Sequence, residues 1–104
     1  MPSSEILSLA ILTPFTGQEN ATLALLREFY TMMNKKGYSR DLLYRDKKSP
    51  SKFVHLRIWK SDAIRSEAQH DPDVHRFWKS LTEVCDVTTA YESLDPVFST
   101  VQRP

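Results

Sequence analysis

Three side chains with chemical potential stand at alternate positions of one short apolar segment. His55, Arg57 and Trp59 are separated by single residues within 53–59. Because side chains of a β-strand alternate between its two faces, we expect all three on one face. A histidine can take a proton near neutral pH, an arginine can hold the resulting anion, and an indole ring can stack on a planar ligand. This face is a candidate wall of a site for a phenol-like molecule; the alternative is a half-buried stripe at a subunit interface.

Further candidates lie elsewhere along the chain. His70, between two expected helices, is either a second candidate base or a loop histidine that fixes a turn. The aromatic residues Trp78 and Tyr44 are expected to pack in the core or to edge a pocket. We predict two groups, which are the catalytic residues His55, His70 and Trp59 and the substrate-binding residues Arg57, Trp78, Tyr44 and Lys79.

Composition limits the classes of function. The chain has 104 residues, enough for one domain, which we expect to span 1–104 with a core over 5–94 and a tail over 95–104. Fourteen basic and 13 acidic residues give a net charge of +1, which argues against a main role in binding nucleic acid or an anionic membrane. One cysteine and three scattered histidines form no metal pattern, and no glycine-rich loop indicates a phosphate-bearing cofactor. With no membrane span or secretory signal in the sequence, we expect a cytoplasmic protein without metal or cofactor.

Hydrophobic periodicity predicts the order β-α-β-β-α-α-β. We expect one long helix after the first strand, two shorter helices before the last strand, and strands over 5–13, 39–45, 53–59 and 87–94.

Capping residues mark the ends of the expected helices. Thr16 and Glu19 form a capping box that should open the long helix, and Gly37 should end it in a left-handed conformation. Ser61 should cap the first short helix, and Asp71, followed by a proline, should cap the second.

This order is that of the ferredoxin-like split β-α-β fold, an α+β class with a four-stranded antiparallel sheet. Right-handed crossovers are expected to place the first and third strands parallel at the centre and the other two at the edges. Helices then cover one face only, yet the first and third strands carry apolar residues on both faces. An uncovered apolar face is typical of an interface, so we predict a homodimer built on it.

The end of the third strand resembles the antibiotic biosynthesis monooxygenase family, whose members form dimeric α/β barrels. The resemblance rests on Ile58-Trp59-Lys60-Ser61-Asp62-Ala63, a strand that ends in Trp-x-Ser before a short helix, and on His70 after it. Phe77, Trp78 and Leu81 on the next helix also fit, and the order of elements agrees over about residues 5 to 94.

The resemblance implies an intertwined homodimer with a pocket between helices and sheet in each subunit. The family includes cofactor-independent oxygenases that convert polycyclic phenols into quinones, as well as haem-degrading enzymes. In the quinone-forming members a tryptophan at the position of Trp59 lies in the active site, but their asparagine four residues earlier is His55 here and their tyrosine six residues later is Arg65. The tryptophan of the haem-degrading branch corresponds to Ala68, which argues against haem degradation.

Three functions from different classes stay open. The first is cofactor-independent oxygenation of a small phenol-like or hydroquinone-like molecule, in which a histidine with a pKa near neutrality removes the proton. The second is a dimeric ligand-binding or structural protein of the same fold without catalysis. The third is an RNA-binding module, which shares the order of elements, but 51–56 lacks the two small residues of the motif that such modules carry. RNA binding is therefore least favoured, and we expect no nucleic-acid partner.

Overall fold

The computed structural model describes residues 5–100, and these form helices and strands in the expected order. The elements are β1 (Ile6–Pro14), α1 (Glu19–Lys35), β2 (Ser39–Arg45), β3 (Phe53–Trp59), α2 (Asp62–Ala68), α3 (Pro72–Val84) and β4 (Cys85–Leu94). The predicted α+β class and ferredoxin-like order are confirmed. The expected tail follows β4, and its last four residues lie outside the described part of the chain. Within that part, no helix is long and apolar enough to cross a membrane.

The sheet has the strand order β2-β3-β1-β4, so β1 and β3 lie at the centre as expected. The expectation that these two strands run parallel is wrong, because every neighbouring pair in the sheet is antiparallel. The crossover through α1 makes β2 parallel to β1, but the hairpin that follows returns β3 between them in the opposite direction. The parallel relations, of β1 with β2 and of β3 with β4, are therefore between strands that are not neighbours in the sheet.

The last strand begins at Cys85, two residues earlier than the sequence suggested, and α3 passes into it without a loop. Val84 ends the helix, and Cys85 already has extended backbone angles. The carbonyl of Val84 accepts a hydrogen bond of 2.9 Å from the backbone N–H of Phe15, just beyond β1. The apolar periodicity of α3 extends through Cys85, so the sequence pattern alone did not separate helix from strand.

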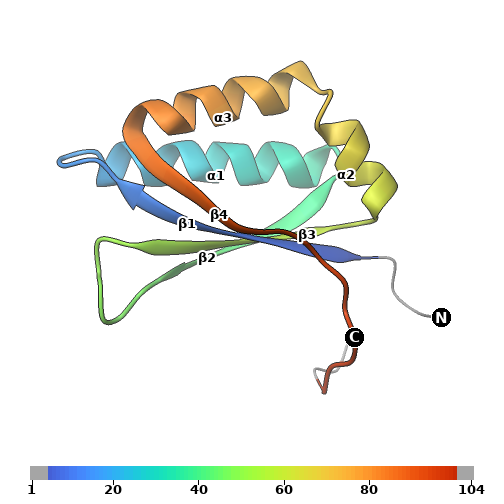
Figure 1. The fold of residues 1–104 in the computed structure, drawn as a ribbon. Coiled ribbons are helices and arrows are strands. Elements are labelled where there is room, and N and C mark those ends of the chain that lie inside the picture. Colours follow the sequence, from blue (N-terminus) through green and yellow to red (C-terminus); the bar gives the residue numbers. More distant parts are fainter. Residues whose placement is uncertain (1–4, 101–104) are drawn as a thin grey trace.

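The helices pack on one face of the sheet, and α1 and α3 lie side by side on it (Figure 1). Phe53, His55, Arg57 and Trp59 of β3 face these helices and are buried, whereas the residues between them are half-buried on the other face. No helix covers that second face in the described residues. We call it the open face.

The helix ends follow the predicted caps with one exception. Ser61 Oγ accepts the backbone N–H of Ile64, and Gly37 has φ +76° with the N–H of Tyr38 bonded to the carbonyl of Met33. The predicted capping box at Thr16 is wrong. Helix α1 begins at Glu19, and its N-cap residue makes no side-chain hydrogen bond to the helix.

The side chain of Glu19 is engaged elsewhere. It forms an ion pair of 3.1 Å with Arg45 at the end of β2 and so does not return to the start of its own helix. Gly17, with φ +78°, completes a tight turn between β1 and α1, which displaces Thr16 from the capping position.

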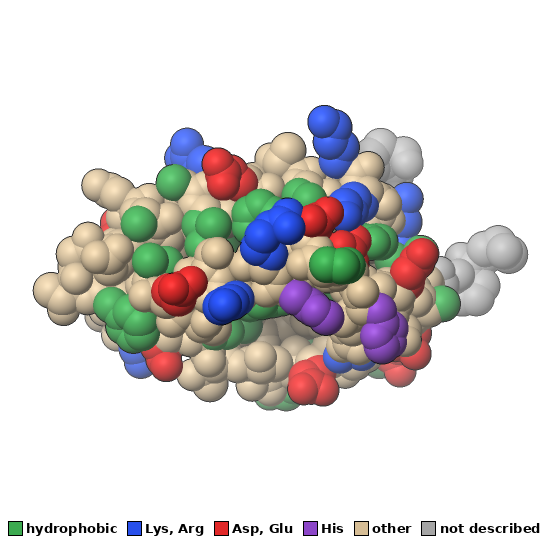
Figure 2. Space-filling model, turned by 90° about the horizontal axis from the view of Figure 1, so that it is seen from above, with side chains coloured by type: hydrophobic (Ala, Val, Ile, Leu, Met, Phe, Trp, Pro, Cys, Tyr) green, Lys and Arg blue, Asp and Glu red, His purple; other side chains and the backbone are tan. Residues whose placement is uncertain are grey.

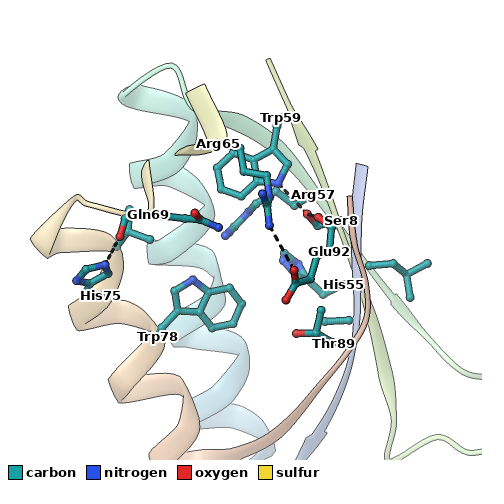
Figure 3. Close-up of a pocket in the computed structure, with 13 residues that line it drawn as sticks. Ser8, His55, Arg57, Trp59, Arg65, Gln69, His75, Trp78, Thr89 and Glu92 are labelled. Atoms are coloured by element: carbon teal, nitrogen blue, oxygen red, sulfur yellow. Dashed lines mark hydrogen bonds and ion pairs between the residues drawn. The ribbon is translucent and has the colours of Figure 1, made fainter. Parts of the chain in front are cut away.

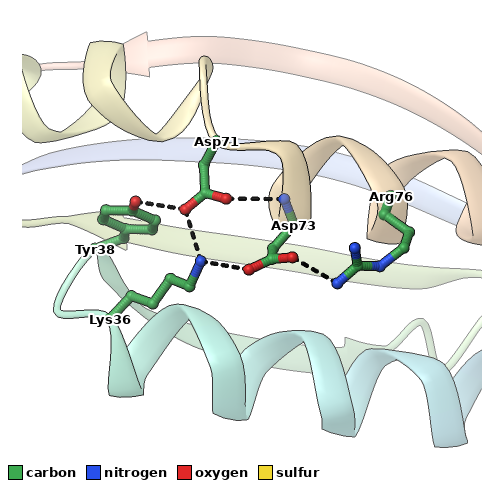
Figure 4. Close-up of polar contacts among 5 residues, drawn as sticks. All are labelled: Lys36, Tyr38, Asp71, Asp73 and Arg76. Atoms are coloured by element: carbon green, nitrogen blue, oxygen red, sulfur yellow. Dashed lines mark hydrogen bonds and ion pairs between the residues drawn. The ribbon is translucent and has the colours of Figure 1, made fainter.

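A group of charged side chains joins the end of α1 to the junction between α2 and α3 (Figure 4). Asp71 caps α3 through the N–H of Asp73, and its other oxygen accepts from Lys36 at 2.8 Å and from the hydroxyl of Tyr38 at 2.6 Å. Asp73 in turn pairs with Lys36 and with Arg76. This arrangement ties the beginning of α3 to the end of α1.

Candidate functional site

A cavity opens between the helix-covered face of the sheet and the helices α2 and α3 (Figure 3). Its volume is about 240 Å³, below the roughly 300–1,000 Å³ of pockets for drug-sized ligands, so it suits a small molecule. Figure 2 shows the surface hollowed beside histidine side chains on this side of the molecule. Strand and helix residues contribute to the lining, which consists of Ser8, Leu9, Ala10, His55, Arg57, Trp59, Arg65, Gln69, Val74, His75, Trp78, Thr89 and Glu92.

Arg57 lies at the base of the cavity and is 1% exposed. Its Cζ is 4.5 Å from the centre of the Phe29 ring, and the rings of Trp59 and Trp78 lie at 5.5 and 5.7 Å. Aromatic faces attract a cation, and this attraction strengthens when the cation is desolvated. The guanidinium is therefore held in place by aromatic rings within the core.

A buried ion pair balances the charge of Arg57. Its Nε donates to Oδ1 of Asp41 at 2.6 Å, and the side chain of Asp41 has no exposed surface. Burial raises the pKa of the Asp41 carboxyl, while the adjacent Arg57 charge opposes that rise. Within residues 5–100, Nη1 and Nη2 of Arg57 are buried and have no hydrogen-bond partner. The pair thus uses one edge of the guanidinium and leaves Nη1 and Nη2 without an acceptor at the base of the cavity.

His55, the first candidate base, is also buried. Burial, together with the charge of Arg57, lowers the pKa of His55 from its ordinary 6.5 to about 3. The ring is therefore neutral at physiological pH, in contrast to the expected pKa near neutrality. Its Nδ1 lies 2.6 Å from the hydroxyl of Tyr30. Burial, with the nearby charge of Asp41, raises the pKa of that tyrosine, so both partners of this hydrogen bond are uncharged.

Two indoles form the aromatic walls of the cavity. Trp59 comes from β3, and its Nε1 donates to Oγ of Ser8 on the neighbouring strand at 2.8 Å. Trp78 comes from α3, and its ring meets that of His55 edge-on at 6.3 Å between centroids. Because the indole nitrogen of Trp59 is bonded to Ser8, that ring has a fixed orientation against the cavity (Figure 3).

Comparison with known proteins places this geometry on a familiar fold. No family model and no curated protein sequence matches the chain. Among solved structures it is similar to SnoaB, a cofactor-independent oxygenase from Streptomyces nogalater (14% identity, 97% of each chain, TM-score 0.75). It is also similar to an antibiotic biosynthesis monooxygenase (19% identity, 88% of this chain and 98% of the other, TM-score 0.73). A protein proposed to have the same activity, from Chloroflexus aurantiacus, aligns over 94% of this chain and 98% of its own (18% identity, TM-score 0.73).

The fold is that of the antibiotic biosynthesis monooxygenases. At identities of this size the structural likeness shows the fold alone, and one fold can carry more than one function. The chemistry therefore has to be argued from the cavity itself.

The structure brings some of the predicted site residues together and separates others. His55, Arg57, Trp59 and Trp78 line the cavity, whereas His70 and Lys79 are exposed and do not.

Tyr44 lies on the opposite side of the sheet. It pairs with Val54 of β3, which places it on the open face, where it is 59% exposed. Tyr44 was predicted to bind substrate, but strand alternation places it elsewhere. Side chains of β2 that lie on the helix-covered face recur at every second position, and Tyr44 lies between two of these positions.

Several lining residues were not among the predicted site residues. Arg65 and Gln69 come from α2 and its C-cap, His75 from α3, and Glu92 from β4. The ring of His75 is hydrogen-bonded to the backbone carbonyl of Gln69, and Arg65 Nη2 lies 3.9 Å from Glu92 across the cavity mouth (Figure 3). Arg65 had been noted because it stands where the quinone-forming members of the family have a tyrosine. No pattern in the sequence indicated Glu92, because its position depends on the irregular pairing of β1 with β4.

The cavity lining offers nitrogen and oxygen groups for an organic ligand. No group of three or more His, Cys, Asp or Glu side chains that could hold a metal ion occurs in the described part of the chain. What the cavity does present is a pair of aromatic walls, a neutral imidazole and a buried guanidinium. This combination fits a small planar molecule that carries an oxygen acceptor.

Proposed function

We propose that the protein binds a small phenol-like or hydroquinone-like aromatic molecule in this cavity and oxygenates it with molecular oxygen, without a cofactor. The observation that carries the proposal is the buried end of Arg57, whose Nη1 and Nη2 have no hydrogen-bond partner among residues 5–100 and lie at the base of a cavity with aromatic walls. Support also comes from the fold, which the chain shares with SnoaB, a cofactor-independent oxygenase.

In this reaction the substrate supplies the electrons. Arg57 stabilises the phenolate, and the electron-rich anion passes an electron to dioxygen, after which the two radicals combine. For an anthrone-like substrate, one oxygen atom becomes the new ring carbonyl, and the other leaves as water with the two hydrogens of that carbon. Because His55 is neutral with a pKa of about 3, it positions the ring system and the phenol proton passes to solvent at the cavity mouth.

Oxygen uptake with a panel of anthrones, naphthols and hydroquinones tests this function. We expect consumption above the rate without protein, and a loss of about a hundredfold in Arg57→Lys, which keeps the positive charge beside Asp41 but lacks the second terminal nitrogen. Lys79→Gln is the matched control, because Lys79 is an exposed cation outside the cavity lining. Uptake that never exceeds the protein-free rate with any member of the panel would contradict the proposal.

One observation favours a second candidate, a ligand-binding protein without catalysis. The low pKa of His55 makes the buried imidazole of the cavity a weak base at neutral pH. Under this alternative the panel binds in the cavity, as fluorescence quenching of Trp59 and Trp78 would show, but no oxygen is consumed.

We also propose a homodimer formed through the open face, with the cytoplasm as its location. Apolar side chains on this face include some that are strongly exposed, among them Leu42, Tyr44 and Tyr91. A contiguous exposed apolar surface favours association.

A further inference from the structure

The buried end of Arg57 makes a specific demand on whatever occupies the cavity. Asp41 accepts from Nε, and no acceptor among the described residues reaches Nη1 or Nη2. A buried donor without an acceptor costs free energy, and the cost is larger for a charged group. A ligand that places oxygen atoms at these nitrogens removes that cost.

The geometry of the guanidinium favours two oxygens over one. The terminal nitrogens lie in one plane and donate in parallel, which matches the two oxygens of a carboxylate. The ring of Phe29 stacks over the guanidinium at 4.5 Å, so a further ligand group meets its edge rather than that face. A lone phenol oxygen would leave more of these N–H groups unsatisfied than a carboxylate would.

A second guanidinium reaches into the same cavity. The side chain of Arg65 from α2 is 19% exposed, and its contact with Glu92 is 3.9 Å long (Figure 3). Glu92 itself is 79% exposed, so water screens this ion pair and little is lost when it opens. Arg65 is therefore available to a ligand that enters from the mouth.

The charges around the cavity would be balanced by one further anion. Arg57 and Arg65 bring two positive charges. Among residues 5–100, Asp41 is the buried acid paired with them, and Glu92 is solvated. A ligand with a single negative charge between the two arginines brings the desolvated charges to zero. Buried charges are tolerated when they are paired and hydrogen-bonded, which an uncharged amide or phenol would not achieve here.

We propose that the natural ligand is an aromatic carboxylate, whose carboxylate group is bound by Arg57 and Arg65 after Arg65 leaves Glu92. The inference rests on the proposed function for the location of the ligand. It assigns the terminal nitrogens of Arg57 to a carboxylate separate from the phenol that reacts, so the charge of Arg57 acts on the phenolate through space and not through these hydrogen bonds. The ring system lies between Trp59 and Trp78, and the carboxylate points to the base of the cavity.

Matched ligands test the inference on the unaltered protein. 2-Naphthoate and 2-naphthamide have nearly the same shape, but only the first carries a carboxylate. We expect calorimetry at neutral pH to give naphthoate a dissociation constant lower by about ten- to a hundredfold, the scale of charge-assisted hydrogen bonds. Equal affinities, or tighter binding of the amide, would overturn the proposal.

A substitution at the cavity mouth separates carboxylate recognition from ring binding. Arg65→Gln removes one charge from a partly exposed helix residue, so folding is preserved. It should raise the dissociation constant of naphthoate by about tenfold and leave that of naphthamide unchanged. Arg76→Gln is the control, since Arg76 is also a helix arginine paired with an acid, but it lies outside the cavity lining. If both variants bind naphthoate like the unaltered protein, Arg65 is not a carboxylate ligand and the proposal fails.

Oxygen uptake with a dihydroxynaphthoate and with its carboxamide distinguishes this inference from the proposed function. Carboxylate-selective binding without uptake would retain the inference and reject oxygenation. Uptake with equal efficiency for acid and amide would retain oxygenation and reject the carboxylate.

Discussion

At the scale of single residues, the base of the cavity holds a buried ion pair in which part of the hydrogen-bonding capacity of the arginine is unused. Asp41 balances the charge of Arg57 and accepts a hydrogen bond from its Nε. The terminal nitrogens of Arg57 have no partners in the part of the chain described. Such a pair is a costly way to stabilise a core, because both ions lose their hydration. This cost is the reason for proposing that a ligand completes the site.

Removing the carboxylate from this pair should destabilise the fold. Asp41→Asn leaves the Arg57 charge buried without compensation, so the free energy of unfolding should fall by about 3–5 kcal/mol. Urea denaturation followed by circular dichroism measures it. Glu19→Gln, which breaks the solvent-exposed pair with Arg45, serves as the control and should change stability little. Equal effects of the two substitutions would show that the Asp41–Arg57 pair is not buried as described.

His55 should make stability depend on pH in a defined window. Its pKa is about 3 in the folded protein, against an ordinary value of 6.5, so between these values the unfolded chain binds a proton that the folded chain does not. The free energy of unfolding should therefore fall as pH decreases from about 6.5 towards 3, by up to about 1.4 kcal/mol per pH unit.

The matched variant is His55→Asn, which keeps a hydrogen-bonding side chain beside Tyr30 but does not titrate. Urea denaturation at pH 7 and pH 5 should show a loss of up to about 2 kcal/mol in the unaltered protein and a smaller one in the variant. Parallel pH profiles for the two proteins would contradict a depressed pKa at His55.

At the scale of elements, most of what positions the site was predictable from local patterns. The alternation in 53–59 placed three side chains on one face of β3, and the caps at Ser61 and Asp71 located α2 and α3. Two features depend on pairing between strands. The irregular β1–β4 pairing brings Glu92 to the cavity, and the register of β2 against β3 decides which of its two alternating faces carries Tyr44. Local periodicity contains no information on such pairings. The pKa of His55 was missed for the same reason, because its burial comes from other elements.

Two substitutions of Asp71, at the junction before α3, separate the contribution of the helix cap from that of the ion pairs. Asp71→Ala removes the N-cap and the contacts with Lys36 and Tyr38, so the free energy of unfolding should fall by at least about 1–2 kcal/mol. Asp71→Asn keeps a good N-cap and loses the negative charge, so its loss measured by urea denaturation should be smaller. If the two variants lose the same amount, the cap contributes nothing measurable at this position.

At the scale of the whole molecule, the sheet separates two surfaces with different properties. One face holds the cavity under the helices, and the open face carries apolar side chains that no helix covers in the described residues. Leu56 lies near the middle of the open face, opposite Leu9 of β1 and Leu42 of β2. The proposed dimer would bury this region.

A charge placed at the centre of the open face should prevent that association. We expect the unaltered protein to sediment as a dimer at micromolar concentration and Leu56→Lys to sediment as a monomer, since an unpaired lysine in an apolar interface is strongly unfavourable. Ala24→Lys, on an exposed position of α1, should remain dimeric. A stable, folded monomer of the unaltered protein at this concentration would contradict the dimer.

The seven residues of β3 also bear on how this protein can change in evolution. Residues of the helix-covered face and of the open face alternate along Phe53–Trp59, so neighbouring codons specify side chains on different surfaces. Substitutions can therefore alter one surface while leaving the other intact. A deletion or insertion of one residue would instead exchange the two sets, turning Arg57 outward and an aliphatic side chain inward. Length variation between relatives should thus be found in the 46–52 hairpin loop and be absent from this strand.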